Sequence, residues 1–458
     1  MLGRVTPYQY QREGVRAIEA FKGRALLADD MGLGKTVQVL HYLRRNPQAL
    51  PHIVVCPAAV KYQWEREAGV QVGLRADVLE GQTPARPGFL RAAPLTIINF
   101  DIAQYWLDYL IALNPQGVTI DECQNIQNSE TIRTKTMRYL CHRVPVLLGL
   151  SGTPLTNRPA ELFPILNLLC PDKYPSFLDY AMRYCKPRKT PWGGWVYTGA
   201  QNLPELNRRL KKDCMIRRMK EDVLDQLPDK VRRVVPVPLS NMEEYLEAKN
   251  NFLGWLKKVG GPRKAAKAAR AEKLVQIGYH RQLAARGKVR AIGAWVDSYL
   301  ANTTEKLVVA AVHTKMIDAL HRHYPYSVVI NGAVTGRART AAVEQFKNDN
   351  RCRLLIGNIK AMGTGVDGLQ RVCRTMAVVE LPWQPGVLTQ LEDRLWRIGQ
   401  NQKAWIYYLI AQDTIEEYLC EILQEKQSVL HATLNGEGEG DDLDILDMLI
   451  KRIAEEKP

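Results

Sequence analysis

A glycine-rich segment near the start of the chain has the composition of a phosphate-binding loop. Residues 29–36 read Asp-Asp-Met-Gly-Leu-Gly-Lys-Thr, after a short apolar run and before a helical pattern. Glycines let backbone N–H groups turn inward around phosphates, and the following helix adds the positive end of its dipole. We expect Lys35 to reach the β- and γ-phosphates and the Thr36 hydroxyl to ligate magnesium. The predicted nucleotide-binding residues of this loop are Asp30, Met31, Gly32, Leu33, Gly34, Lys35 and Thr36.

An acidic pair follows a second apolar run, residues 117–120. Asp121 is placed to hold magnesium through water, and Glu122 to activate the attacking water. An isolated Asp-Glu pair after a strand is more often a surface turn, but this pair lies downstream of the loop in the same alternating unit. Residues 151–154, Ser-Gly-Thr-Pro, end a further apolar run, and we expect their hydroxyls to relay the nucleotide state.

A third segment whose side chains could take part in catalysis lies far downstream. Residues 390–400 read Gln-Leu-Glu-Asp-Arg-Leu-Trp-Arg-Ile-Gly-Gln. Arg394 and Arg397 are three positions apart, which predicts that they share one face of a helix. From that face both guanidinium groups could approach a γ-phosphate when two lobes close. The alternative interpretation is the basic surface of a solvated helix.

Short apolar runs alternate with amphipathic stretches in two parts of the chain. Strands that alternate with helices predict a parallel sheet covered on both faces. The sequence therefore predicts an α/β fold with two parallel-sheet units and a mostly helical block, residues 158–300, between them. The predicted strands are 25–28, 53–55, 95–98, 117–120 and 146–150 in the first unit, and 306–311, 327–330, 353–356, 376–379 and 405–410 in the second.

The charge balance favours a polyanionic partner. The 458 residues include 63 Lys and Arg against 48 Asp and Glu, a net charge of +15. Lys and Arg that neutralise phosphates release condensed counterions, so such an excess favours nucleic acid, although a soluble protein can also simply be basic. Between residues 255 and 290, eleven basic residues accompany the single acid Glu272. We predict DNA phosphate contacts here, the alternative being a solvated helix face. The predicted contacts are Arg263, Lys264, Lys267 and Arg270.

Several classes of protein do not fit the sequence. No stretch approaches 18 consecutive apolar residues, so a membrane span is not expected. The first seven residues lack the apolar core of a signal peptide, which predicts a protein on the cytosolic side of membranes. None of the nine cysteines forms a Cys-x-x-Cys pair, so neither a zinc module nor a dithiol redox site is expected.

Taken together, these segments resemble the Swi/Snf-type DNA translocases of helicase superfamily two, and most of all their annealing-helicase, HARP-like branch. Asp29 stands where the general loop pattern has glycine, a departure that superfamily-two loops share. The resemblance spans residues 5–430. The matching segments are 10–15 (the adenine-reading Gln motif), 27–36 (motif I), Cys56-Pro57 with Trp64 (motif Ia), 121–124 (motif II), 150–154 (motif III), 217–228 (the segment before the linker), 331–346 (motif IVa), 362–369 (motif V) and 390–400 (motif VI).

The resemblance implies two RecA-like lobes of a P-loop NTPase that binds ATP and Mg²⁺ and acts on double-stranded DNA as a monomer, without sequence preference. Gln11 would read the adenine, and Gly365 and Asp367 of motif V would also face the nucleotide. Such a protein would work in the nucleoid of a bacterium or phage host, or in a eukaryotic nucleus. The predicted domains are 1–235 (first lobe, with a helical insertion at 158–230), 236–300 (basic helical region), 301–435 (second lobe) and 436–458 (acidic tail).

The sequence departs from the family at three places. Motif II ends Cys123-Gln124 where a small residue and His are usual, motif VI has Trp396 in a His position, and motif V carries Asp367. The resemblance implies that the positions of Gln124 and Trp396 affect the coupling of hydrolysis to lobe movement. Two rival functions stay open: a strand-separating helicase on DNA or RNA, for which no wedge element is visible, and an ATP-gated DNA clamp with little turnover.

Overall fold

The structure is a computed structural model. It describes residues 6–84, 93–142, 144–154, 158–189, 193–197, 199–224, 226–259, 266–334, 336–363, 365–435, 448–449 and 452, and the side chains of residues 252–273, 336–337 and 426–435 lie outside that description. The chain divides into two compact units, residues 1–226 with 429–442, and residues 227–428 with 443–458.

The first unit is built on a sheet of seven parallel strands in the order β3-β4-β2-β5-β6-β1-β9. In a parallel sheet all carboxyl ends meet at one edge. The segments that follow β1, β5 and β6 therefore lie at the same edge. The strands are β1 (Arg24–Leu27), β2 (His52–Cys56), β3 (Ala76–Val78), β4 (Leu95–Asn99), β5 (Gly117–Asp121), β6 (Val146–Leu150) and β9 (Met215–Ile216).

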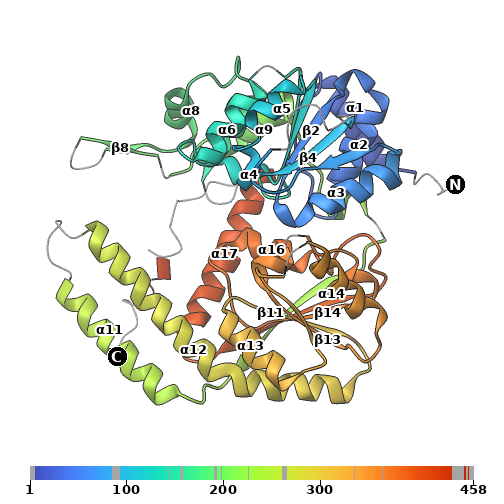
Figure 1. The fold of residues 1–458 in the computed structure, drawn as a ribbon. Helices are drawn as coiled ribbons and strands as arrows, with labels where there is room; N and C mark the ends of the chain where they lie inside the picture. Colours follow the sequence, from blue (N-terminus) through green and yellow to red (C-terminus); the bar gives the residue numbers. More distant parts are fainter. Residues whose placement is uncertain are drawn as a thin grey trace. The chain divides into compact units, whose positions relative to one another are not determined.

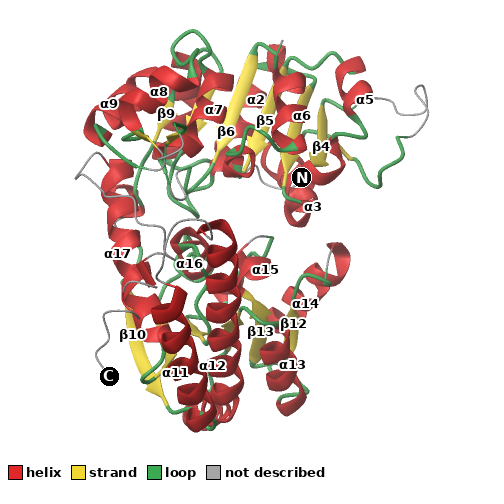
Figure 2. Cartoon of the chain, turned by 90° about the vertical axis from the view of Figure 1, so that its left-hand side faces the viewer, coloured by secondary structure: helices red, strands yellow, loops and turns green. Residues whose placement is uncertain are grey.

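Helices cover both faces of this sheet because side chains alternate along each strand (Figure 2). Leu26 packs in one buried cluster with α6 and α7, whereas Ala25 and Leu27 pack in another with α1 and α2. A small antiparallel pair, β7 (Arg188–Lys189) and β8 (Trp195–Val196), lies apart from the sheet. The helices are α1 (Gln9–Ala20), α2 (Lys35–Arg45), α3 (Lys61–Glu67), α4 (Phe100–Ala103), α5 (Leu107–Ala112), α6 (Ile132–Cys141), α7 (Phe163–Leu169), α8 (Phe177–Tyr184), α9 (Leu203–Asp213) and α10 (Lys220–Val223).

The second unit repeats the design with six parallel strands in the order β10-β15-β14-β11-β13-β12 (Figure 1). Val308 and Ala310 pack against α14, α16 and α17, and Leu307 and Val309 against α12 and α13. The strands are β10 (Lys230–Val237), β11 (Leu307–Ala311), β12 (Val328–Ile330), β13 (Leu354–Asn358), β14 (Thr375–Val378) and β15 (Ala404–Ala411). The helices are α11 (Met242–Val259), α12 (Ala266–Asn302), α13 (Thr314–His323), α14 (Gly336–Asn348), α15 (Ile359–Gly363), α16 (Pro385–Glu392) and α17 (Ile415–Asn435).

The predicted fold class, two RecA-like parallel-sheet lobes with added helices, is confirmed. The grouping of segments differs in detail. β10 pairs along its whole length with β15, so residues 230–235 belong to the second sheet and not to the first lobe. The region 236–300 also packs on this sheet through α12, although it was expected to be a region of its own. This packing could not be predicted from the sequence, because the described part of α12 buries the polar residues His280, Arg281 and Lys288 among its apolar ones.

No helix in the described part of the chain has both the length and the apolar character needed to cross a membrane.

Candidate nucleotide site

The phosphate-binding loop runs from the end of β1 to the first turn of α2. Gly32 and Gly34 both have positive φ, 83° and 73°, and Gly34 is the N-cap of α2. A Cβ on Gly34 would lie 2.4 Å from the amide nitrogen of Gln11. The positive φ therefore favours glycine at position 34, and a larger residue there would also have to displace the Gln11 side chain. The turn after β6 lies against the same loop, since a Cβ on Gly152 would come within 2.4 Å of Met31 Cγ.

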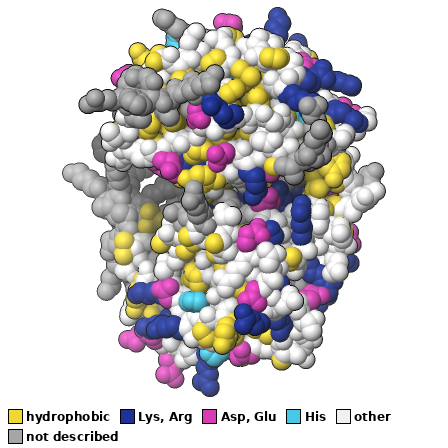
Figure 3. All heavy atoms as spheres, turned by 45° about the vertical axis from the view of Figure 1, so that its right-hand side comes forward, with side chains coloured by type: hydrophobic (Ala, Val, Ile, Leu, Met, Phe, Trp, Pro, Cys, Tyr) yellow, Lys and Arg dark blue, Asp and Glu magenta, His cyan; other side chains and the backbone are white. Residues whose placement is uncertain are grey.

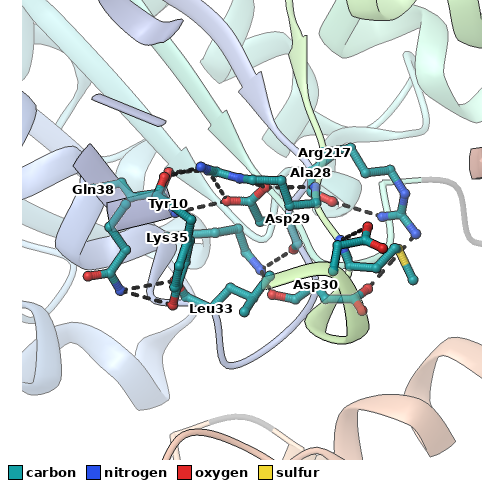
Figure 4. Close-up of polar contacts among 12 residues, drawn as sticks. Tyr10, Ala28, Asp29, Asp30, Leu33, Lys35, Gln38 and Arg217 are labelled. Carbon is teal, nitrogen blue, oxygen red and sulfur yellow. Dashed lines mark hydrogen bonds and ion pairs between the residues drawn. The ribbon is translucent and has the colours of Figure 1, made fainter. Parts of the chain in front are cut away.

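Lys35 extends along the loop toward β1. Its Nζ donates hydrogen bonds to the carbonyl oxygens of Asp29 (2.7 Å) and Asp30 (3.2 Å) (Figure 4). Burial lowers the pKa of Lys35 from its ordinary value, and the nearby carboxylates, Glu122 first among them, oppose that shift. A desolvated ammonium group that donates to backbone carbonyls can take up a phosphate oxygen as an additional partner.

The acidic pair lies at the carboxyl end of β5. Trp64 Nε1 donates to Asp121 Oδ2 (2.8 Å), and the backbone N–H of Glu122 donates to Asp121 Oδ1 (3.0 Å). Burial, and then the charge of Glu122, raises the pKa of Asp121 to about 6. A buried carboxylate whose ionisation is opposed by a second carboxylate beside it fits a divalent cation, which would relieve that repulsion. The carboxylate of Asp121 and the hydroxyl of Thr36, in the first turn of α2, are oxygen ligands of the kind that Mg²⁺ prefers.

Glu122 adopts a conformation that is rare for a residue with a side chain. Its φ is 52°, in the left-handed region. Its Oε2 accepts a hydrogen bond from Gln124 Nε2 (2.7 Å). Gln124 occupies one of the positions where the sequence departs from the family, and it orients the predicted water-activating carboxylate. Backbone strain of this kind persists where surrounding structure fixes it, often at functional sites.

Behind the loop lies a buried ion pair that the sequence analysis did not identify. Asp29 is fully buried, and Arg218 Nη2 lies 2.5 Å from its Oδ2. Arg218 also donates to Gln38 Oε1 (2.8 Å) and to the carbonyl of Tyr10, so it joins α1, α2 and the loop. The only available signal was the Arg217-Arg218 string, 189 positions from Asp29 in the chain.

Residues next to Arg218 hold the rest of the loop (Figure 4). Arg217 Nη1 donates to the carbonyl of Ala28 (2.8 Å), and the backbone N–H of Lys220 donates to Asp30 Oδ2 (3.2 Å). Asp30 is thus engaged with the segment after β9. Residues 217–220 therefore hold in place Asp29 and Asp30, whose carbonyls accept hydrogen bonds from Lys35.

Gln11, the predicted adenine ligand, is buried against the loop. Its Nε2 donates to the carbonyl of Leu33 (3.2 Å), and its Oε1 accepts from the backbone N–H of Tyr8 (3.0 Å). Both ends of the amide therefore have protein partners in this structure. The contact brings Gln11 to the phosphate loop, and adenine recognition by this residue stays a prediction.

The arginines of motif VI lie in the second unit, where α16 ends at Glu392. The expectation that Arg394 and Arg397 share a helical face is wrong, because both follow the helix in a series of tight turns that ends at Gly399 (φ 91°). Both nevertheless reach motif V. Arg394 Nη1 donates to the carbonyl of Val366 (3.0 Å), and Arg397 Nη1 lies 3.0 Å from Asp367 Oδ1. The structure brings these two predicted arginines to Asp367 and its neighbours, and Gly365 has φ 71°.

Glu392 and Trp396 anchor the motif VI turns to β10. Lys230 Nζ lies 2.9 Å and Arg232 Nη2 2.6 Å from Glu392 Oε2, and Glu392 is fully buried. Burial alone would raise the pKa of Glu392, but these two cations outweigh it and hold the pKa at about 2. Trp396 Nε1 donates to the carbonyl of Pro228 (2.7 Å), and Lys230 lies over its ring.

The predicted DNA contacts are not placed by the structure. Arg263 and Lys264 lie outside the described residues, and Lys267 and Arg270 lie on α12 with side chains outside the description. Two of the eleven basic residues counted in this region have another role: Lys288 Nζ lies 2.6 Å from Glu416 Oε2 in the core, and Arg281 stacks over Trp383. On the face drawn in Figure 3, the described basic side chains form separate groups with acidic ones between them.

These observations define a class of protein: a two-unit α/β protein with a phosphate-binding loop, a buried acidic pair and a closing turn at one sheet edge. Comparison with known proteins agrees. The SNF2-related domain family matches residues 10–274, and the helicase conserved C-terminal domain family matches residues 288–399. The chain belongs to the SNF2 family of helicase-related ATP hydrolases, as the sequence resemblance predicted.

Individual relatives include annealing helicases. The chain is 33% identical over 440 residues to the Xenopus tropicalis SWI/SNF-related matrix-associated actin-dependent regulator of chromatin subfamily A-like protein 1, covering 92% of this chain and 44% of that protein. It is 30% identical over 445 residues to the human DNA annealing helicase and endonuclease ZRANB3, covering 94% and 40%. It thus spans less than half of either relative. A solved Sulfolobus solfataricus SWI2/SNF2 ATPase core in complex with dsDNA is 20% identical, covers 98% of this chain and 95% of that chain, and has a TM-score of 0.45.

Proposed function

We propose that this chain hydrolyses ATP in its first unit and uses the energy to move along double-stranded DNA, remodelling DNA structures or displacing bound proteins. The observation that carries the proposal is the edge of the first sheet. There the phosphate loop with Lys35 lies beside the carboxylates of Asp121 and Glu122, close enough that Glu122 raises and Lys35 lowers the pKa of Asp121. A lysine beside two adjacent carboxylates is suited to a magnesium–phosphate ligand.

Each residue has a separate role in this proposal. Lys35 and the N–H groups of the loop bind phosphate oxygens, and Thr36 and Asp121 hold Mg²⁺. Bound Mg²⁺ would neutralise phosphate charge and polarise the phosphoryl group. Glu122, oriented by Gln124, accepts a proton from the attacking water. Arg394 and Arg397 are proposed to stabilise charge on the transferred phosphoryl group.

The proposed partner is the DNA duplex. Membership of the SNF2 family and the net charge of +15 support it. Contacts mainly to phosphates would give binding without sequence preference and with a strong dependence on salt. This proposal also places the protein where DNA is, in a nucleoid or a nucleus.

ATPase rates measured with plain duplex, single-stranded, forked and RNA cofactors test the proposal. Wild-type protein should be stimulated strongly by duplex DNA and hardly by RNA. Lys35→Ala should lower turnover by at least about 10²-fold while DNA binding at low salt is retained, because its charge serves phosphates. Glu122→Gln should bind ATP but lower turnover by about 10²- to 10⁴-fold, since only the proton acceptor is lost.

Matched controls lie on the surface of the same unit. Lys135 and Glu130 form an exposed ion pair, so Lys135→Ala and Glu130→Gln should hydrolyse ATP at the wild-type rate. Equal turnover in Lys35→Ala and wild type would remove the loop assignment. Duplex binding with no stimulated turnover in the wild type would instead favour an ATP-gated clamp.

A further inference from the structure

The small hairpin β7–β8 of the first unit is exposed on both faces. It extends away from α8 and from the sheet (Figure 1). Lys189 pairs with Trp195 and Arg188 with Val196, and all four side chains are exposed, 44% of Trp195 among them. A two-stranded hairpin that buries no face is marginally stable by itself. Its exposed side chains therefore do not serve the core of the unit.

The base of the hairpin is nevertheless held firmly. The backbone N–H of Gln201 donates to the carbonyl of Tyr184 (3.0 Å), and Gln201 Nε2 donates to that of Met182 (2.8 Å). Tyr197 packs edge-on against Phe177 with ring centroids 5.4 Å apart. The hairpin is thus an exposed element on a fixed base, which suits a surface that must meet a partner in a defined orientation.

The chemistry of the hairpin matches nucleic acid with unpaired bases. Residues 185–200 contain three basic residues and no acidic one. Lys189 Nζ lies 5.4 Å from the ring centroid of Trp195, so an aromatic face and a cation are presented together. Aromatic rings stack on unpaired bases while neighbouring cations contact phosphates. A plain duplex hides the faces of its bases, so Trp195 can stack only where strands are separated.

We propose that the β7–β8 hairpin binds an unpaired nucleotide, with Trp195 stacking on the base and Arg188 and Lys189 contacting phosphates. The inference rests on the proposed function in one respect, that DNA is the partner. It adds a second DNA-contacting surface that recognises tails and junctions and does not contribute to binding of plain duplex.

The test compares the affinity of the whole chain, without nucleotide, for a blunt duplex and for the same duplex with a single-stranded tail. A 2-aminopurine in the tail reports stacking by quenching. The tail raises the affinity over that for blunt duplex by a certain factor, and Trp195→Ala should lower that factor about five- to 150-fold. The same variant should abolish the quenching of 2-aminopurine. Affinity for blunt duplex and duplex-stimulated ATPase should be unchanged, and Trp195→Phe should retain most of the effect. Tyr139→Ala, which removes another exposed aromatic ring of this unit, is the control.

A second variant tests the phosphate contacts. Replacing Arg188 and Lys189 with Gln should reduce the log–log salt slope for the tail contribution by about 1.4, at roughly 0.7 per lost contact to a single strand. The inference is overturned if a tail adds no affinity to the wild type, or if Trp195→Ala keeps the full tail contribution. The latter result would assign the hairpin, with the exposed Leu178 and Met182 of α8, to a protein partner. If blunt duplex is not bound either, it is the proposed function that fails.

Discussion

At the scale of single residues, Glu392 of the second unit is a buried carboxylate that pairs with two cations. It is buried between Lys230 and Arg232, next to the two proposed catalytic arginines. An ion pair of this kind gains little over an apolar contact, but removing one partner leaves the other charges without compensation. Glu392 therefore fixes the motif VI turns. Its replacement should lower the free energy of unfolding, because Lys230 and Arg232 would lose the carboxylate that compensates their charges.

Glu392→Gln should lower the free energy of unfolding of the second unit by about 3 kcal/mol at pH 7. The folded pKa of about 2 lies below the ordinary value, so the stabilisation is present above about pH 4.3 and is lost as the pH falls toward 2. Denaturant midpoints of wild type and variant should differ equally at pH 7 and pH 5 and converge below pH 4. Glu305→Gln, which breaks the partly exposed pair with Arg374, should cost at most about 1 kcal/mol. A difference that widens with acid would contradict the account.

At residue scale, the positions of the phosphate loop and of the acidic strand end could be predicted from the sequence. Gly34, Lys35 and Asp121 follow from local strings, because a phosphate loop and an acidic strand end are contiguous in sequence. Arg218 and Glu392 were not found, because their partners lie far away along the chain and no short pattern records such pairing. Trp396 was noted only as a departure from the family, although its indole nitrogen has a defined acceptor in Pro228.

At the scale of elements, the segment between β9 and α10 supports the phosphate loop. Arg218 holds Asp29, and the carbonyl of Asp29 in turn accepts from Lys35. The same segment leads within a few residues to the boundary between the two units at 226–227. It is therefore a positioning element for Lys35 at the point where the chain passes from one unit to the next.

Arg218→Met should raise the KM for ATP by about tenfold or more with a smaller change in kcat, because the loop loses its buried support. Unfolding should also become easier by about 3–5 kcal/mol, since Asp29 is left buried and unpaired. The double variant Asp29→Asn with Arg218→Met should regain part of that stability. Arg45→Met, which breaks an exposed pair with Glu19, is the matched control. Unchanged KM in Arg218→Met would reduce this residue to a purely structural role.

The elements themselves were predicted where apolar runs are long and uninterrupted, as in β2 and β14. Predictions of packing failed where polar side chains are buried in the core. The basic region that includes α12 was predicted to contact DNA phosphates, with a solvated face as the alternative, yet Lys288 of α12 lies in the core with three acceptors, two carbonyls and Glu416. The turns that carry Arg394 and Arg397 looked helical by spacing alone, although α16 ends at Glu392.

At the scale of the whole molecule, the account requires two α/β units whose nucleotide chemistry is coupled to DNA movement. The fold class and family are established, and movement along double-stranded DNA belongs to the proposal. A strand-separating helicase would share the same loop and acidic pair, so ATPase assays alone do not distinguish the two functions.

Displacement of a third strand from a DNA triplex tests the central claim most directly. A motor that moves along duplex DNA should release the third strand in an ATP-dependent reaction, and should leave a simple tailed duplex intact. Lys35→Ala and Glu122→Gln should release none, whereas Lys135→Ala should match the wild type. Efficient unwinding of the tailed duplex with no triplex displacement would contradict the account and identify a strand-separating helicase.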